Sequence, residues 1–373
     1  MYYYIKTFGC QINKNESERQ AAFYEQNGLK ETDDWQKATK IFINTCSVRK
    51  AADDRVYALL NKIQLYYQNK NDKPEIILSG CMTRYGDKLL NKYPILTKIQ
   101  PPSTISFDLP TKRKDQTQAF VQISTGCNSF CTYCVVPYAR GREKSRSMDD
   151  IMKEINQAIA HGYQEITLLG QNVNSWGLEK VSIGTRKENF AHIPSNASQY
   201  HDYQGTPPFV KLLQEISKLE QVKKIRFLTS NPWDFHEELI AEIGQNKKID
   251  RFLHLPVQSG SNGVLKRMNR GYTREKYLEI IKKLKQVDSN IQIGTDIIVG
   301  FANETEEEFL ETVDLVRQAN FIVAFVAIYS VRTGTVAAKI YQDEIPFAEK
   351  KRRFEILDKM INKDQLANRP KIV

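Results

Sequence analysis

The sequence predicts an α/β protein in which an N-terminal open parallel sheet is followed by a partial TIM-type β/α barrel. Short apolar runs of strand length alternate with segments that carry apolar residues at three- and four-residue steps, as amphipathic helices do. Alternation of strand and helix implies parallel strands. A stretch rich in proline and charge, residues 101–118, interrupts the pattern and divides the chain into two α/β parts.

The first part is a strand–helix repeat. Its predicted strands and helices are residues 2–8, 16–27, 41–45, 53–67 and 76–79. A cysteine follows each strand: Cys10, Cys46 and Cys81. The ends of parallel strands share one edge of a sheet, where ligands bind, so the three thiols can meet there. The alternative is three buried structural cysteines, because a free cysteine packs like a small hydrophobe. Their shared register favours a three-thiolate site.

The second part repeats the alternation over a longer stretch. Its predicted strands are residues 120–123, 165–169, 224–228, 252–255, 291–299 and 321–329, with helices such as 148–161 and 273–287 between them. This number of βα units in one domain predicts a full or partial barrel whose strand ends face one mouth. We therefore expect an N-terminal domain over 1–115, a barrel domain over 116–345 with a surface insertion at 178–206, and a C-terminal helix and tail over 346–373.

The other three cysteines, Cys127, Cys131 and Cys134, follow the first predicted barrel strand. Their spacing lets three thiolates hold one compact iron–sulfur cluster, and three thiolates on a four-iron cubane leave one iron open to a small chelating cofactor. Zinc is the alternative, but it usually has a fourth cysteine or histidine nearby. His161, the nearest histidine in sequence, lies 27 residues beyond Cys134. The spacing therefore favours the cluster.

Composition and charge narrow the class of protein. No apolar run has the length needed to span a membrane. We expect no signal segment, because the start leads directly into a predicted strand, and six free thiols fit a reducing cytoplasm. The net charge of +10 suits an anionic partner such as nucleic acid. Four basic residues follow the second cysteine set, where they can contact phosphates or balance the charge of a cluster: Arg140, Arg142, Lys144 and Arg146.

Taken together, these motifs resemble the radical-SAM methylthiotransferase family, most closely its MiaB-type branch that modifies tRNA. The stretches that carry the resemblance are Phe-Gly-Cys10-Gln-Ile-Asn, Asn-Thr-Cys46-Ser-Val-Arg, Ser-Gly-Cys81-Met, Gly-Cys127-Asn-Ser-Phe-Cys131-Thr-Tyr-Cys134-Val-Val-Pro-Tyr, Leu-Leu-Gly170-Gln-Asn-Val-Asn-Ser-Trp-Gly, His254-Leu-Pro-Val-Gln-Ser-Gly-Ser and Gly294-Thr-Asp-Ile-Ile-Val-Gly-Phe. They run nearly from end to end of the chain. The resemblance implies a radical-SAM barrel.

The resemblance also implies two 4Fe-4S clusters and S-adenosylmethionine (SAM), of which two are used per turnover. An auxiliary cluster would sit on the first cysteine set, and the SAM-binding cluster on the second. Elements of the SAM pocket are expected at Gln171, Asn172, Gly294 and Gly300. The implied reaction is radical methylthiolation at C2 of N(6)-isopentenyladenosine at position 37 of tRNA, next to the anticodon.

Partners and alternatives follow from the same resemblance. The implied partners are the tRNA anticodon stem-loop, an electron donor such as flavodoxin or ferredoxin, and a sulfur donor; the protein is expected to be a cytoplasmic monomer that needs no membrane. The family's usual C-terminal TRAM β-barrel is expected to be missing, and the short spacer between Cys81 and Cys127 suggests an N-terminal domain without its last strand and helix. The alternatives are methylthiolation of threonylcarbamoyladenosine in tRNA or of an aspartate in a ribosomal protein, and a non-catalytic iron–sulfur RNA-binding protein.

Overall fold

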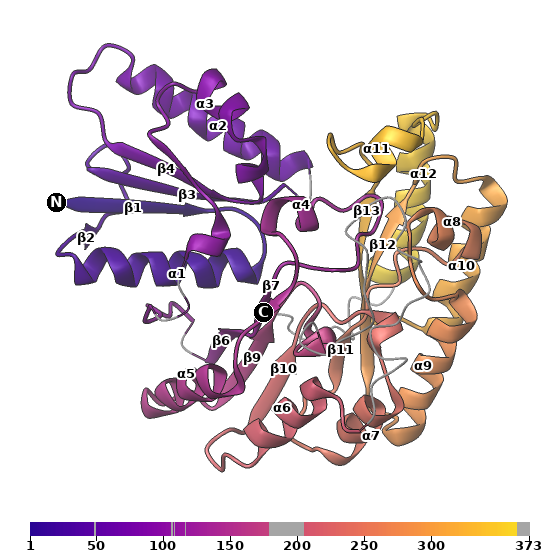
Figure 1. Ribbon diagram of the computed structural model, residues 1–373. Coiled ribbons are helices and arrows are strands. Elements are labelled where there is room, and N and C mark those ends of the chain that lie inside the picture. Colours follow the sequence, from indigo (N-terminus) through magenta and orange to yellow (C-terminus); the bar gives the residue numbers. More distant parts are fainter. Residues whose placement is uncertain (48–49, 106, 108, 116, 179–204, 364–373) are drawn as a thin grey trace.

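The computed structural model describes residues 1–47, 50–105, 107, 109–115, 117–178 and 205–363. Two α/β parts lie side by side in it, with the N-terminal part (indigo and purple) against one flank of the larger second part (magenta to yellow) (Figure 1). The predicted insertion at 178–206 and the tail beyond residue 363 lie almost wholly outside the described residues.

The N-terminal domain is built on a five-stranded parallel sheet in the order β2-β1-β3-β4-β5. Its strands are β1 (Tyr2–Thr7), β2 (Lys30–Glu31), β3 (Lys40–Thr45), β4 (Glu75–Gly80) and β5 (Lys98–Gln100). Its helices are α1 (Gln11–Gln26), α2 (Lys50–Tyr67) and α3 (Asp87–Lys92), with a 3-10 turn, η1 (Cys81–Tyr85), after β4. The expectation that the last strand and helix are absent was wrong, because α3 and β5 occupy the spacer.

Alternating side chains explain why this sheet is covered on both faces. On β3, Ile41 and Ile43 point to one face and pack with Val56 and Leu60 of α2. Phe42 points to the other face and packs with the α1 side. A strand that is buried on both faces carries a continuous apolar run, as residues 41–43 do. Figure 1 shows α1 on one side of the sheet and α2 and α3 on the other.

The second part is a partial parallel barrel of six strands. One three-stranded sheet has the order β10-β9-β6 and the other β11-β12-β13. A parallel bridge from Ile225 of β10 to Ile249, just before β11, links the two sheets. The strands are β6 (Gln118–Gln122), β9 (Glu165–Leu169), β10 (Lys224–Phe227), β11 (Phe252–His254), β12 (Gln292–Val299) and β13 (Val323–Ile328). A short antiparallel pair, β7 (Ser124–Thr125) and β8 (Lys144–Ser145), follows the first of them.

Helices cover the outside of this barrel (Figure 1). They are α5 (Met148–Ala160), α6 (Pro208–Ser217), α7 (Glu237–Gln245), α8 (Asn262–Arg267), α9 (Arg274–Val287), α10 (Glu306–Ala319), α11 (Val336–Ile340) and α12 (Phe347–Asp358); α4 (Val136–Arg140) lies next to the N-terminal domain. The main hydrophobic core joins these helices, except α11, to the outward side chains of the strands, among them Ile297, Val299 and Ala324. The alternate side chains on β12 and β13, such as Asp296 and Phe325, therefore face the inside of the barrel. Ala337 of α11 belongs to a separate cluster with Phe301 and Tyr329.

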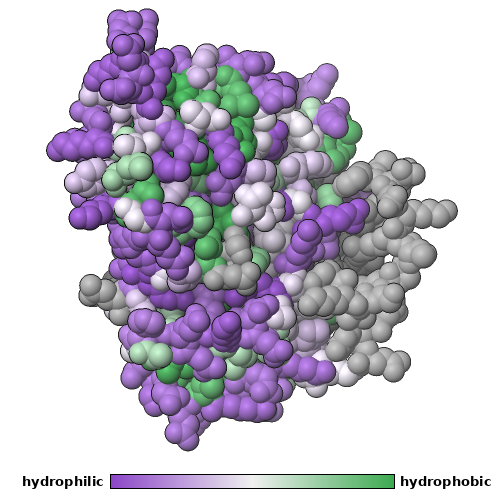
Figure 2. Space-filling view, turned by 60° about the vertical axis from the view of Figure 1, so that its left-hand side comes forward, coloured by the Kyte–Doolittle hydropathy of each residue, from purple (hydrophilic) through white to green (hydrophobic). Residues whose placement is uncertain are grey.

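The surface is dominated by polar and charged side chains. In the view of Figure 2, hydrophilic residues cover most of the face, and hydrophobic residues gather in a band from its upper edge to its centre. Among the described helices, none combines the length and the apolar character needed to cross a bilayer.

Candidate active site between the two domains

The first cysteine set lies at the carboxyl edge of the N-terminal sheet. Cys46 and Cys81 each follow directly on a strand end, and the register pairs those ends, Thr45 with Gly80. Cys10 lies just beyond β1 and immediately before α1. Three neighbouring strands thus deliver one thiol each to the same edge, as the strand pattern predicts.

Two glycines allow this close approach. A Cβ added to Gly9, whose φ is +111°, would stand 2.6 Å from the Cβ of Cys46 and 3.3 Å from its sulfur. A Cβ added to Gly80, whose φ is +86°, would stand 2.1 Å from the carbonyl oxygen of Thr45. Both the positive φ and the contact require glycine, so the Phe-Gly-Cys10 and Ser-Gly-Cys81 motifs have a steric cause.

The second cysteine set forms a loop beyond β6 in which each sulfur accepts a hydrogen bond. The backbone N–H groups of Ser129 and Val136 donate to the sulfurs of Cys127 and Cys134 at 3.5 and 3.4 Å. The guanidinium of Arg270 donates to Cys131 at 3.2 Å. Such hydrogen bonds to sulfur are a means by which proteins tune iron–sulfur clusters.

Burial raises the pKa of two of these thiols, Cys127 and Cys134. Desolvation, followed by the negative charges of Glu143 and Cys131, raises the pKa of Cys127 to about 12. Desolvation also raises the pKa of Cys134. Thiolates bind metal and thiols do not, so loading this site must release protons. Across the described residues, no three Cys, His, Asp or Glu side chains converge as a single metal ion requires.

The two cysteine sets adjoin one another across the domain interface. Helix α4, which starts two residues after Cys134, packs on η1, whose first residue is Cys81. The charge of Cys81 is among those that act on Cys134. On the same interface, Ile12 of α1 packs against Phe120 and Leu169 of the barrel. The edge of the N-terminal sheet and the mouth of the barrel thus form one site.

The mouth also carries buried polar atoms that suit a polar cofactor. Within the described part of the chain, the hydroxyls of Ser124 and Ser230 and the amide oxygen of Gln171 are buried and accept or donate no hydrogen bond. They follow β6, β10 and β9 respectively, so three neighbouring strands present an unsatisfied group beyond their carboxyl ends. Buried polar groups of this kind are normally satisfied, and a bound polar molecule such as SAM would satisfy them.

The four predicted SAM-pocket residues differ in whether contacts within the protein already account for them. Gln171 belongs to this group of unsatisfied atoms, and Asn172 beside it donates to the carboxylate of Asp234 at 2.7 Å. Gly294 lies deeper in β12, where a Cβ would stand 2.6 Å from the ring of Phe252. Gly300 turns the chain after β12 with a φ of +66°. Packing and a turn therefore account for both glycines without a cofactor.

Two of the four basic residues predicted as phosphate contacts are buried in ion pairs. Arg140 and Arg146 are only 6% and 7% exposed, whereas Arg142 and Lys144 are exposed. Arg140 pairs with Glu16 of α1, and Arg146 with Glu154 of α5 at 2.6 Å. Of the two alternatives, contact with phosphates was therefore wrong for Arg140 and Arg146, whereas Arg142 and Lys144 are exposed as such a contact requires.

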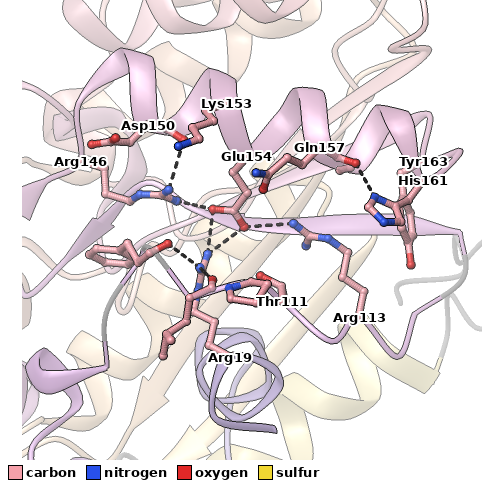
Figure 3. A pocket seen from close by; sticks show the side chains of 14 residues that line it. Arg19, Thr111, Arg113, Arg146, Asp150, Lys153, Glu154, Gln157, His161 and Tyr163 are labelled. Carbon is pink, nitrogen blue, oxygen red and sulfur yellow. Dashed lines mark hydrogen bonds and ion pairs between the residues drawn. The ribbon is translucent and has the colours of Figure 1, made fainter. Parts of the chain in front are cut away.

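Glu154 is the centre of a buried ion cluster that ties the domains together (Figure 3). Its two carboxylate oxygens each accept from Arg19 of α1 at 2.7 Å, and Arg113 of the linker donates at 3.0 Å. With Arg146 the carboxylate holds three arginines from three segments, beside a cavity of about 660 Å³. Burial raises the pKa of Glu154, but the three arginines outweigh it and hold that pKa below its usual value.

Replacing Glu154 with Gln is expected to destabilise the protein by about 3–5 kcal/mol, because three buried guanidinium groups would lose their shared counter-charge. Urea unfolding followed by circular dichroism measures the change. Glu215→Gln is the control, since Glu215 pairs with Lys218 on the exposed face of α6 and its loss should leave the midpoint unchanged. Equal midpoints for the two variants would contradict a central role of Glu154.

The structure adds site residues that sequence reasoning missed. Arg270 and Glu143 contact or act on the second cysteine set, and Asn13 and Glu16 lie beside the first. Asn13 and Glu16 lie three and six residues beyond Cys10, in the first two turns of the helix that starts at the sheet edge. They are therefore close to the first cysteine set. That spacing was a usable signal. Arg270 lies 139 residues from Cys131 and had none.

Comparison with known proteins shows which family the two domains belong to. The model of the radical SAM superfamily matches residues 121–316, and that of the uncharacterized protein family UPF0004 matches residues 2–99. The tRNA-2-methylthio-N(6)-dimethylallyladenosine synthase of Thermoanaerobacter pseudethanolicus is 40% identical, covering 98% of this chain and 79% of the relative. The chain belongs to the radical SAM methylthiotransferase family. The corresponding synthase of Thermotoga petrophila is 39% identical over 96% of this chain and 81% of its own length.

Solved structures agree with the family at the level of the fold. The radical SAM methyltransferase TsrM from Kitasatospora setae has a TM-score of 0.61 at 13% identity, covering 90% of this chain and 75% of TsrM. The radical SAM enzyme OxsB has a TM-score of 0.55 at 13% identity, covering 98% of this chain and 55% of OxsB. Membership of the family makes this methylthiotransferase an enzyme that uses a [4Fe–4S] cluster and SAM.

Proposed function

We propose that this enzyme methylthiolates C2 of N(6)-isopentenyladenosine at position 37 of tRNA. In this proposal Cys127, Cys131 and Cys134 hold the cluster that binds SAM, and the first cysteine set holds an auxiliary cluster. The observation that carries it is the meeting of both cysteine sets at one interface, where Cys81 and Cys134 are electrostatic neighbours. A reaction that joins radical formation to sulfur transfer needs both at one substrate position.

The chain's own residues provide the walls of the substrate site. Bound SAM supplies the carbon radical that abstracts hydrogen, and the barrel excludes water from it. Inside the barrel, Phe325 is 41% exposed and its ring centroid lies 5.8 Å from that of His254. His254 in turn lies 3.1 Å from the carboxylate of Asp296, the register partner of Phe325. An exposed aromatic beside a hydrogen-bonding pair is suited to a purine base.

Phe325 is also the best-placed side chain for the isopentenyl group. Four aromatic residues near the mouth are candidates from the sequence: Trp176, Phe209, Phe325 and Tyr329. The other three are at most 6% exposed and belong to the hydrophobic cores. Burying a five-carbon group is worth on the order of 3 to 4 kcal/mol. That corresponds to a preference of more than about a hundredfold over unmodified adenosine.

A comparison of two anticodon stem-loops tests the preference. With the isopentenyl group we expect turnover at least about a hundredfold faster than without it. Phe325→Ala is expected to reduce that ratio, because the apolar contact is lost, whereas Phe347→Ala removes an aromatic that is 69% exposed on α12 and should leave it unchanged. Equal rates on both stem-loops would mean that the group is not recognised and would favour a protein substrate.

Mass spectrometry of the product tests the proposed function itself. The reconstituted protein, given SAM, a reductant such as reduced flavodoxin or ferredoxin, a sulfur donor and the isopentenylated stem-loop, should yield the 2-methylthio nucleoside. Methylthiolation of threonylcarbamoyladenosine or of a ribosomal-protein aspartate instead would transfer the proposal to that substrate. Absence of 5′-deoxyadenosine would indicate a non-catalytic iron–sulfur protein. In the cell we place the reaction in the cytoplasm and attribute it to a monomer.

A further inference from the structure

The side chain of Arg140 crosses from the barrel domain to the first cysteine set. Arg140 is the last residue of α4, six residues beyond Cys134. Its side chain is 2% exposed and enters the N-terminal domain, where Nη2 donates to Asn13 Oδ1 at 2.8 Å and to Glu16 Oε2 at 3.1 Å. Nη1 donates to the other oxygen of Glu16. A buried arginine with two acceptors in another domain has a fixed position.

Asn13 joins this arginine to the first cysteine set. Its Nδ2 donates to the backbone oxygens of Phe8 and Thr45 at 2.7 and 2.8 Å, which orients Oδ1 toward Arg140. The thiol of Cys10 lies 3.7 Å from the same Oδ1. Thr45 directly precedes Cys46, so Asn13 contacts the segments that carry two of the three cysteines. The charge of Arg140 acts on Cys10 and on Cys81.

We infer that Arg140 is the charge partner of the auxiliary cluster, supplied by the domain that carries the SAM-binding cysteines. This inference rests on the proposed function, because it requires a cluster on Cys10, Cys46 and Cys81. A cluster on three thiolates becomes more negative when it takes up an electron, so a fixed positive charge favours the reduced form. Glu16, which is 3% exposed, opposes part of that effect. Docking of the barrel domain therefore sets the redox behaviour of the N-terminal site.

The prediction concerns the direction in which two substitutions shift the midpoint potential of the auxiliary cluster. In the full chain with Cys127, Cys131 and Cys134 replaced by Ala, the auxiliary cluster is the only one left, and its midpoint potential can be measured by EPR-monitored redox titration after anaerobic reconstitution. Arg140→Gln is expected to shift the potential to more negative values, and Glu16→Gln to more positive values. Arg140→Lys keeps the charge and should shift it less than Arg140→Gln. The double variant Arg140→Gln/Glu16→Gln should lie close to the parent.

The control is Arg353→Gln, which removes a charge that is equally buried but is paired with Glu304 within the barrel domain. Its potential should equal that of the parent, which separates a charge effect from a general loss of packing. Shifts of the same sign for Arg140→Gln and Glu16→Gln, or a shift for Arg140→Gln no larger than for Arg353→Gln, would overturn the inference alone. A parent that takes up no iron would overturn the auxiliary cluster, and with it both the proposed function and this inference.

Discussion

Replacing Cys127, Cys131 and Cys134 together with Ala is expected to abolish formation of 5′-deoxyadenosine and to leave about half of the iron. SAM is cleaved only when it is bound to a reduced cluster, and in the proposed assignment these three cysteines hold that cluster. The product is measured by chromatography after the anaerobically reconstituted, dithionite-reduced protein is given SAM. Full iron content in this variant would show that the cysteines have been assigned to the wrong group.

Replacing Cys10, Cys46 and Cys81 with Ala is expected to have a different outcome. Iron should again fall to about half, but 5′-deoxyadenosine should still form, because the three cysteines proposed to hold the SAM-binding cluster are intact. Methylthiolation of the stem-loop should be lost, since the auxiliary cluster is the proposed place of the sulfur. The two variants are controls for each other. If both abolish 5′-deoxyadenosine, the two sites are not separable, and the division of roles is contradicted.

Most of the fold could be predicted from periodicity. The long, apolar strands and the helices between them give strong signals, and they lie where the pattern places them. The short elements α3 and β5 were missed because six and three residues are too few for a period to be seen. Helix α1 begins five residues before its predicted start, at Gln11, because its first turns are polar although many of them are buried.

That buried polar face explains what else could not be predicted. Asn13, Glu16 and Arg19 are buried because they pair with residues of the barrel domain, more than 120 positions away in sequence. The run of basic residues after Cys134 has the local pattern of a solvent-exposed, anion-binding surface. Only the tertiary partners, Glu16 and Glu154, show that Arg140 and Arg146 form buried ion pairs. Cysteine spacing, by contrast, is local and could be recognised directly.

The central claim is that one chain holds two clusters next to each other at the domain interface. EPR of the dithionite-reduced, reconstituted wild-type protein tests it most directly. Two neighbouring reduced clusters are both paramagnetic and interact, so we expect a signal broader than the sum of the signals from the two triple-alanine variants, with about eight irons per chain. A spectrum equal to that of one variant alone, with about four irons per chain, would contradict the account.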